Sequence, residues 1–219
     1  MSSADIAQQL ALWADKLRDV SSSGLRFSSN IYDKENYQAA QNVAMEMLAL
    51  ASGVTVDEIE PLRTPHFSRP TPLSVGDAAV IDTQGRILLI QRADNAMWAM
   101  PGGMFEVGES PAEGAVRETF EETGVHCRAK SFIGVFDSRL MAGKSRFHLY
   151  HFTFLCEPIP EKPEEPAPFA HETLGVGWFT EDGLPTSIDP GHVTRIPKAF
   201  DMWRNGGPAF FDNPANVTE

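Results

Sequence analysis

The sequence predicts an α/β protein that is preceded by a small N-terminal helical hairpin domain. Three observations carry this prediction: a strongly signalled helix at 111–123, apolar strand-like runs on both sides of it, and apolar residues at helical spacing in the N-terminal part. The chain has 219 residues and 42% hydrophobic content, which is enough to bury a full core. We therefore expect a helical domain over residues 1–65 and an α/β domain over residues 66–219.

The first expected element is an amphipathic helix that follows Ser3. A polar segment, Ser21–Gly24, is expected to end it. The second helix is expected to begin at Asp33, with Tyr32 and Tyr37 as a hydrophobic staple around its cap. Two helices of this size bury too little to fold alone, so they must pack on the rest of the chain or on a second copy. The apolar positions are Ile6, Leu10, Trp13, Ala14 and Leu17 in the first helix, and Tyr37, Ala40, Val43, Ala44, Met47 and Ala51 in the second.

Strands are expected next, after a proline-containing linker over Pro61–Pro72. Residues 74–92 contain two apolar runs that are joined by a hairpin turn at Asp82–Gly85. Further β-rich runs follow the strongly signalled helix, and together these runs predict a sheet. The later runs are Ser131–Phe136, Phe147–Cys156 and Trp178–Phe179, the last of which precedes Leu184–Pro185.

The central helix has a complete set of boundary signals. Ser110 at the N-cap and Glu113 three residues later form a capping box, Pro111 fits the first helical position, and Gly124 fits the C-terminal stop. The spacing predicts a helix over Pro111–Thr123. Its apolar stripe consists of Ala112, Ala115, Val116 and Phe120, which leaves Glu118, Glu121 and Glu122 on or near the opposite side.

These three glutamates predict a metal site. Their i, i+3, i+4 spacing stacks the carboxylates of Glu118, Glu121 and Glu122 on one side of the helix, where like charges repel. A cluster of carboxylate oxygens is what Mg²⁺ or Mn²⁺ requires. Glu109 lies in a glycine-containing loop before the cap, and we expect Arg117 to bridge Glu109 and the helical glutamates and to fix their rotamers.

The run also resembles the Nudix box, G-x5-E-x7-R-E-U-x-E-E-x-G-U, in which U is a bulky aliphatic residue. The one departure is Thr119 at the first U position, where its methyl group still packs. The resemblance covers about two thirds of the chain and includes Trp98–Gly103, which is similar to the W-x-x-P-G-G approach to the box. It implies an α/β/α sandwich around a mixed sheet. The matching positions are Gly103, Glu109, Arg117, Glu118, Glu121, Glu122, Gly124 and Val125.

The Nudix resemblance further implies divalent-metal-dependent hydrolysis of a pyrophosphate bridge. It implies metal ligation by Glu118, Glu121, Glu122 and the carbonyl of Gly102, with Glu109 and Arg117 orienting them. The general base lies in the box or in the loop 158–176. Within that loop we prefer Glu172, with Glu164 and Glu165 as alternatives in a proline-rich stretch; without a base there, the role returns to the box, to Glu121.

Arginines outside the box are candidate phosphate ligands. Arg92 matches a position where Nudix enzymes often place a phosphate-contacting arginine, and a surface ion pair is the other reading. Arg139 and Arg146 flank a glycine-containing loop and could reach a phosphate, or remain solvated charges.

The N-terminal helices resemble a domain found in Nudix enzymes that act on nucleoside diphosphates linked to a moiety X. That resemblance implies a homodimer through the helices and substrates such as ADP-ribose or CDP-choline, cleaved to a nucleoside monophosphate and phosphoryl-X. The alternatives are another nucleotide, such as a dinucleoside polyphosphate or an oxidised nucleotide, a non-catalytic ligand sensor, or helices that only cover a sheet edge.

Composition limits the partners. A net charge of −12 argues against nonspecific nucleic-acid binding, because duplex binders carry a basic footprint. No apolar run is long enough to span a membrane and no signal-peptide pattern opens the sequence, so we expect a cytoplasmic enzyme without a membrane partner. Cys127 and Cys156 are expected to pack as small hydrophobes.

Overall fold

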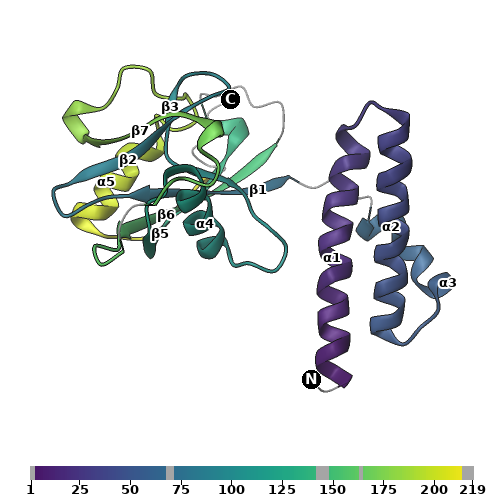
Figure 1. Cartoon of the computed structure of the whole chain (residues 1–219). Helices are drawn as coiled ribbons and strands as arrows, with labels where there is room; N and C mark the ends of the chain where they lie inside the picture. Colours follow the sequence, from purple (N-terminus) through teal and green to yellow (C-terminus); the bar gives the residue numbers. More distant parts are fainter. Residues whose placement is uncertain (1–2, 68–71, 142–147, 163–164, 214–219) are drawn as a thin grey trace. The chain divides into compact units, whose positions relative to one another are not determined.

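The computed structural model describes residues 3–67, 72–141, 148–162 and 165–213. The chain divides into two compact units, residues 1–71 with 106–108, and residues 72–105 with 109–219. Figure 1 shows the helices of the first and the sheets of the second.

The first unit is built on two long antiparallel helices, α1 (Ser3–Phe27) and α2 (Ile31–Ser52). Three short helical segments complete it: α3 (Val56–Ile59), η1 (Glu60–Leu62) and η2 (Arg63–Phe67). The predicted helical hairpin is therefore present, and the added turns contribute two residues to its core. The core residues are Ala44, Met45, Ala49, Ile59 and Phe67.

Both predicted boundaries inside this hairpin were wrong. Helix α1 continues through Ser21 because its hydroxyl bonds the Arg18 carbonyl at 3.0 Å and the side chain is buried, so the serine remains satisfied within a helix. Helix α2 begins at Ile31 rather than Asp33, because the Asn30 side chain caps it by accepting the N–H of Tyr32 at 2.9 Å.

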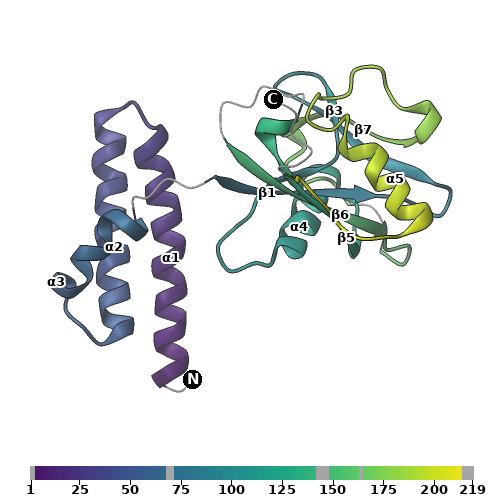
Figure 2. The same cartoon turned by 180° about the vertical axis from the view of Figure 1, so that it is seen from behind.

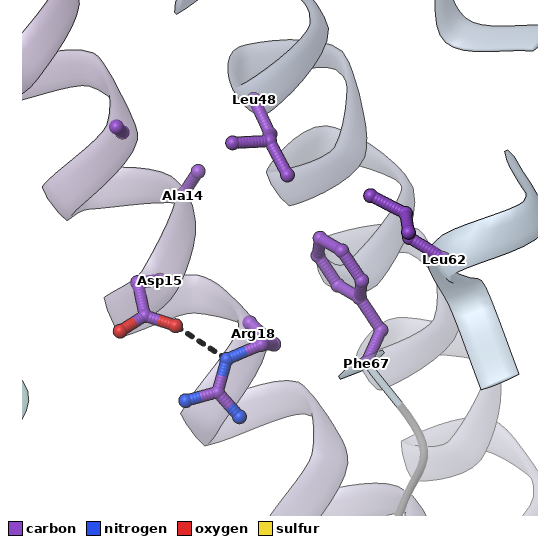
Figure 3. Close-up of a pocket in the computed structure, with 7 residues that line it drawn as sticks. Ala14, Asp15, Arg18, Leu48, Leu62 and Phe67 are labelled. Atoms are coloured by element: carbon purple, nitrogen blue, oxygen red, sulfur yellow. Dashed lines mark hydrogen bonds and ion pairs between the residues drawn. The ribbon is translucent and has the colours of Figure 1, made fainter. Parts of the chain in front are cut away.

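The predicted linker was also wrong over its first half. Residues 61–67 form helical turns that pack on α2, and the carbonyl of buried Phe67 accepts a hydrogen bond from Gln41 Nε2 at 3.1 Å. Pro70 lies outside the described residues. A cavity of about 480 Å³ remains among these elements, with the Asp15–Arg18 ion pair on its wall (Figure 3). Its other lining residues are Ala11, Ala14, Leu48, Leu62 and Phe67.

The second unit contains two sheets. The larger is mixed, since β1 runs parallel to β6 and antiparallel to β4, whereas β5 runs antiparallel to β6 and parallel to β8. The smaller sheet is antiparallel. In order, the larger sheet is β4 (Gly102–Met104), β1 (Leu73–Val80), β6 (Leu149–Pro158), β5 (Cys127–Asp137) and β8 (Phe210–Phe211), and the smaller is β3 (Trp98–Ala99), β2 (Arg86–Arg92) and β7 (Thr173–Thr180).

The first hairpin links these two sheets. The predicted turn is present: the N–H of Gly85 bonds the Asp82 carbonyl, and Asp82 Oδ1 accepts the N–H of Arg86 at 2.9 Å. Strands β1 and β2 nevertheless pair only at the single bridge Ile81–Ile87 and then enter different sheets. The hairpin prediction was therefore right about the turn and wrong about the pairing.

Helices cover both faces of the larger sheet, as the expected sandwich requires. Alternate residues of a strand point to opposite faces. Ala78 and Val80 of β1 accordingly pack in a cluster with helix α4 (Pro111–Thr123), whereas Ala79 packs in a cluster with helix α5 (Arg195–Asn205). Figure 2, seen from behind, brings α5 to the front of the sheet.

Helix α5 was not predicted. Its sequence carries Pro197 and no side-chain cap, both of which weaken a helical signal. Proline is tolerated there because it occupies the first turn, where its missing N–H has no partner within the helix. Buried Ile196 and Phe200 then hold the helix on the sheet.

The expectation for the two cysteines is confirmed. Cys127 and Cys156 are free and buried. Phe210 docks on the sheet, where it stacks on Phe136 with ring centroids 4.8 Å apart, although Phe211 is exposed. Over the described parts of the chain, every helix is too short or too polar to cross a membrane.

Candidate active site

Helix α4 carries the predicted site residues and has the predicted bounds. The Ser110 hydroxyl accepts the N–H of Glu113 at 3.3 Å, and the Glu113 carboxylate accepts the N–H of Ser110 at 2.8 Å, so the capping box is complete. Gly124 ends the helix at φ +72°, in the left-handed region that glycine tolerates. These caps fix where the helix begins and ends, and so which way each glutamate on it points.

One face assignment on α4 was wrong. Glu122 was expected near the exposed side, but the residue is only 7% exposed and lies on the inner face with Ala115 and Thr119. Thr119 can be buried there because its hydroxyl bonds the Ala115 carbonyl at 2.8 Å. A carboxylate therefore points into the sandwich, where water cannot solvate it.

Arg117 connects the loop before the helix to the helical carboxylates, as the spacing predicts. Its Nε and Nη2 donate to the two oxygens of Glu109 at 3.0 and 2.8 Å. Its Nη1 donates to Glu118 at 2.9 Å and to Glu121 at 2.8 Å. Nη2 also donates to the Met104 carbonyl at 3.1 Å. One guanidinium thus fixes three carboxylates to one another and to the strand β4.

Glu118 and Glu122 lie against the glycines of β4. The N–H of Gly102 donates to Glu122 Oε2 at 2.9 Å. A Cβ atom on Gly103 would lie 2.6 Å from the Glu118 carboxylate, so this glycine makes room for it. Burial is the main reason that the pKa of Glu122 is raised to about 8, and the charges of Glu118 and Glu172 add to it. Burial likewise raises the pKa of Glu118.

Glu172 lies near these two carboxylates. It ends a short turn, η4 (Ala170–Glu172), that is tied to α4 by the N–H of Phe169, which donates to the Glu121 carbonyl at 2.8 Å. The Glu172 carbonyl accepts the N–H of Ala93 at 3.0 Å. Its negative charge raises the pKa of both Glu118 and Glu122, and its side chain is 54% exposed.

The alternative bases are placed differently. The Glu165 side chain lies 2.9 Å from His126 Nε2, and its N–H donates to the Gly124 carbonyl beyond the end of α4. Glu164 lies outside the described residues. Of the loop carboxylates that the structure describes, Glu172 is the one whose charge acts on Glu118 and Glu122.

The two arginine candidates have different surroundings. Arg92 forms a two-bond ion pair with Asp94, at 2.9 and 2.7 Å, and its positive charge acts on Glu122. Arg139 is held by Asp137 and is mostly exposed. Arg92 therefore lies close to the carboxylate cluster, whereas Arg139 belongs to the Asp137 pair. Arg146 lies outside the described residues.

A cavity of about 470 Å³ adjoins Arg92, and a buried charge cluster forms part of its wall. This cluster consists of His151, His192 and Arg195, which line the cavity, and of Asp77, which they contact; none of the four was proposed from sequence as a site residue. Both polar and apolar side chains line the rest of the cavity. The remaining lining residues are Asp94, Asn95, Met97, Ser138, Met141, Leu149, Asp189, Pro190 and Gly191.

Within the cluster, Arg195 Nη1 donates to Asp77 Oδ2, and Arg195 Nε donates to the Gly191 carbonyl at 2.9 Å. Burial alone would raise the pKa of Asp77, but Arg195 and the hydrogen bond from His151, together with smaller contributions from the two imidazoles, hold that pKa well below its ordinary value. Burial lowers the pKa of His192, and Arg195 lowers it further, so this imidazole is neutral.

The comparisons with known proteins agree with this geometry. The NUDIX domain profile matches residues 70–199, which is more than half of the chain. The chain belongs to the Nudix family. A second profile, described as a UDP-X-like, N-terminal oligomerisation domain, matches residues 8–62.

Some relatives of this Nudix hydrolase extend over both of its parts, and others over little more than half of the chain. The putative ADP-ribose pyrophosphatase YjhB of Bacillus subtilis (strain 168) is 31% identical over 195 residues, 88% of this chain and 91% of that protein. The ADP-ribose pyrophosphatase of Methanocaldococcus jannaschii is 44% identical over 130 residues, 58% of this chain and 72% of that one. A crystal structure of UDP-X diphosphatase has a TM-score of 0.59 and 24% identity, covers 97% of this chain and 100% of its own, and supports the fold. The protein is thus a Nudix hydrolase with an N-terminal domain of the UDP-X-like type.

Nudix hydrolases generally use divalent metal ions, and the donor chemistry here fits one. Within the described residues, no three His, Cys, Asp or Glu side chains are already arranged around one point. The charges of Glu118 and Glu172 nevertheless raise the cost of ionising buried Glu122, and those of Glu121 and Glu172 raise the cost of ionising Glu118, which is the condition that a cation relieves.

The buried charge cluster could have been found from one signal. Asp77 stands inside the apolar run Val75–Ile81, and a carboxylate in the middle of a buried strand needs a positive partner. The identity of that partner was not readable, because Arg195 follows Asp77 by 118 positions and begins a helix that has weak signals.

Proposed function

We propose that this enzyme hydrolyses the pyrophosphate bond of a nucleoside diphosphate linked to a moiety X, with ADP-ribose as the leading substrate and Mg²⁺ or Mn²⁺ as cofactor. The products are a nucleoside monophosphate and phosphoryl-X. The observation that carries the proposal is the placement of buried Glu122 and half-buried Glu118 beside the β4 glycines, with Arg117 binding Glu118 and Glu121.

The choice of substrate is supported by the relatives that match both parts of the chain. One relative, which this chain matches over nearly its whole length, is named a putative ADP-ribose pyrophosphatase. The profile that matches the N-terminal part is described as UDP-X-like. A second candidate is an oxidised nucleotide, because a putative 8-oxo-dGTP diphosphatase of Bacillus subtilis (strain 168) is 44% identical over 117 residues, 53% of this chain and 72% of that one. CDP-choline and a dinucleoside polyphosphate share the same bridge.

Each site residue has a proposed role. Glu118, Glu121, Glu122 and the carbonyl of Gly102 would hold the metal, which when bound neutralises phosphate oxygens and acidifies a water. Arg117 fixes Glu109, Glu118 and Glu121 in position through the bonds described above, so that these carboxylates do not have to reorganise during the reaction.

Glu172 is the proposed general base. Its half-exposed carboxylate is not held in an ion pair with an arginine or lysine in the described structure, and its charge acts on the buried glutamates. A base must reach the attacking water, and a partly exposed group beside the carboxylate cluster satisfies that need.

Two arginines are proposed as substrate ligands. Arg92 lines the 470 Å³ cavity and would bind a phosphate by its planar fork once the substrate competes with Asp94. Arg139 would have to leave Asp137 to do the same, so its proposed contact is with an outer part of the substrate.

We further propose a homodimer through the N-terminal helices. Four large apolar residues recur at seven-residue intervals along α1, and each is 44–57% exposed. A stripe of this period is typical of a helix that packs on another helix. The four are Ile6, Trp13, Val20 and Phe27, and α2 adds exposed Val43 and Leu50 at the same interval.

A substrate panel tests the function. Purified protein is incubated with Mg²⁺ or Mn²⁺ and ADP-ribose, a UDP-sugar, CDP-choline, a dinucleoside polyphosphate or 8-oxo-dGTP, and the products are identified by mass. We expect the highest kcat/KM for a nucleoside diphosphate linked to a sugar. A preference for 8-oxo-dGTP would establish the second candidate instead.

The variant Glu122→Gln tests the metal assignment. It keeps the shape of the side chain and removes one ligand charge, so turnover should fall by roughly a hundredfold or more while the fold is kept. Circular dichroism and unfolding curves serve as the control for folding. Unchanged kinetics at saturating Mg²⁺ would show that Glu122 is not a ligand.

A further inference from the structure

The segment between β7 and α5 runs beside β3 and completes its hydrogen bonds. The N–H of Trp98 donates to the Ser187 carbonyl at 2.8 Å, and the N–H of Asp189 donates to the Trp98 carbonyl at 2.8 Å. Two residues after Trp98, the N–H of Met100 donates to His192 Nδ1 at 3.2 Å. A side-chain nitrogen thus replaces a strand carbonyl at the point where the backbone turns toward β4.

This hydrogen bond is buried, and it requires one particular tautomer of the His192 ring. Met100 and His192 are 1% and 5% exposed, so water cannot substitute for a lost partner. Since Nδ1 accepts, the proton of the neutral ring is on Nε2, which faces Asp77 Oδ1 at 3.9 Å. Asp77 in turn is held by Arg195. The buried pair therefore favours the tautomer that can bind Met100.

Met100 is followed by Pro101 and by Gly102, whose carbonyl is a proposed metal ligand. The Pro101 carbonyl accepts the N–H of Ala78 at 3.0 Å, and Gly102 pairs with Asp77 across β1 and β4. Gly102 also donates to Glu122. The packing is close: a Cβ atom on Gly102 would lie 2.1 Å from the Gly76 carbonyl oxygen. Small rotations of this segment would therefore move both the Gly102 carbonyl and the partner of Glu122.

We infer that His192 is a positioning residue, whose ring holds the segment 100–102 so that the Gly102 carbonyl and Glu122 are set for the metal. This inference rests on the proposed function, because it takes the Gly102 carbonyl and Glu122 as metal ligands. His192 acts through the backbone rather than on substrate, since its Nδ1 is already bound and the residue is almost fully buried. Loss of the Nδ1 acceptor should weaken metal binding more than it weakens substrate binding.

A pair of amide variants tests the inference. In His192→Asn the side-chain oxygen can occupy the place of Nδ1 and accept the N–H of Met100. In His192→Gln the amide reaches the place of Nε2 and leaves that N–H without a partner. Mn²⁺ is titrated into the metal-free full-length protein by calorimetry, with wild type and Glu122→Gln measured in parallel.

We expect His192→Gln to bind Mn²⁺ about tenfold or more weakly than wild type, and His192→Asn to stay within about threefold. The KM for substrate at saturating Mn²⁺ should be similar in both. A merely structural role would lower the stability of both variants without separating their Mn²⁺ affinities. Equal affinities in the two variants would overturn the inference while leaving the proposed function intact.

The proposed function is judged by the parallel samples. If wild type binds no Mn²⁺, or if Glu122→Gln binds it as tightly as wild type, the metal assignment fails and His192 has no metal site to position. Wild-type binding that is lost in Glu122→Gln and unaffected in His192→Gln rejects the role of His192 alone.

Discussion

Glu122 shows how one residue can serve the site at a cost to the fold. Its carboxylate is buried, and the single backbone hydrogen bond from Gly102 does not offset the loss of water. Folding alone would favour a neutral group at this position. A bound cation changes this balance, because ionised Glu122 then gains an opposite charge in a place of low polarity.

The pH dependence of stability tests this reading of Glu122. Its pKa rises from 4.5 in the unfolded chain to about 8 in the fold, so between these values the folded state binds more protons than the unfolded state. The free energy of unfolding of the metal-free protein should therefore fall as pH rises from about 5 to 8. Urea unfolding should show a decrease that is roughly 1–3 kcal/mol larger in wild type than in Glu122→Gln. Parallel pH curves for the two proteins would contradict the raised pKa.

Glu172→Gln separates the proposed base from the proposed metal ligands. If Glu172 activates water, kcat should fall by about tenfold or more, whereas the metal concentration for half-maximal rate should change little, because the loss appears only in the transition state. The measurement is a metal titration of the steady-state rate, with Glu165→Gln as the matched loop control. An effect below about threefold, under roughly 0.7 kcal/mol, would return the role of base to the box, to Glu121.

At the scale of elements, strand β4 and helix α4 work as one unit. The strand can lie close to the helix only because Gly103 lacks a side chain at the place that Glu118 occupies. Gly114 does the same on the helix, where a Cβ atom would lie 2.6 Å from Glu109 Oε1. Gly103 and Gly114 are therefore explained by carboxylate packing.

Gly103→Ala should displace the Glu118 carboxylate. The added methyl would lie 2.6 Å from it, and because Glu118 is tied to Arg117, the neighbouring carboxylates should shift as well. We expect a fall in kcat/KM of about a hundredfold, comparable to the loss of a ligand, with the secondary structure retained. Ser110→Ala is the comparison, because it removes a helix cap worth about 1 kcal/mol without touching the carboxylates. Equal activity losses in the two variants would mean that helix stability, and not Glu118, is responsible.

Sequence alone predicted the elements whose signals are local. The caps of α4, its length and the Arg117 bridge follow from residues within one or two turns of each other. The division of β1 and β2 between two sheets did not follow, because a turn sequence does not determine what each strand pairs with afterwards. The inward setting of Glu122 was missed for a related reason, since the apolar stripe of a helix does not exclude a buried carboxylate with a partner on another strand.

At the scale of the whole molecule, the N-terminal unit has more exposed apolar surface than a free hairpin needs. None of the four residues of the seven-residue stripe on α1 belongs to the buried core of its own unit. The buried residues of that core come from α2 and from the turns that follow it. Burial of large side chains contributes roughly 1.5–3 kcal/mol each, which is sufficient for a few of them to hold two copies together.

The double variant Trp13→Glu with Val20→Glu should convert the proposed dimer to a monomer. It places charge in the middle of the stripe while leaving the residues of the unit core unchanged. Sedimentation at micromolar concentration measures the change, with helicity by circular dichroism as the folding control. Gln8→Glu, at an exposed position off the stripe, is the matched control and should stay dimeric. A monomeric wild type would show that the stripe has no role in self-association.

Strand β1 places successive residues in three different environments. Asp77 belongs to the buried charge cluster, Ala78 and Val80 pack toward α4, and Ala79 packs toward α5, as does Ile81 just after the strand. A single-codon insertion or deletion within this strand would exchange the two cores and turn Asp77 away from Arg195 and from the backbone of Gly102. The turn at Asp82–Gly85 can accept a change of length without that exchange, so we expect viable variants in chain length to arise there and not inside the strand.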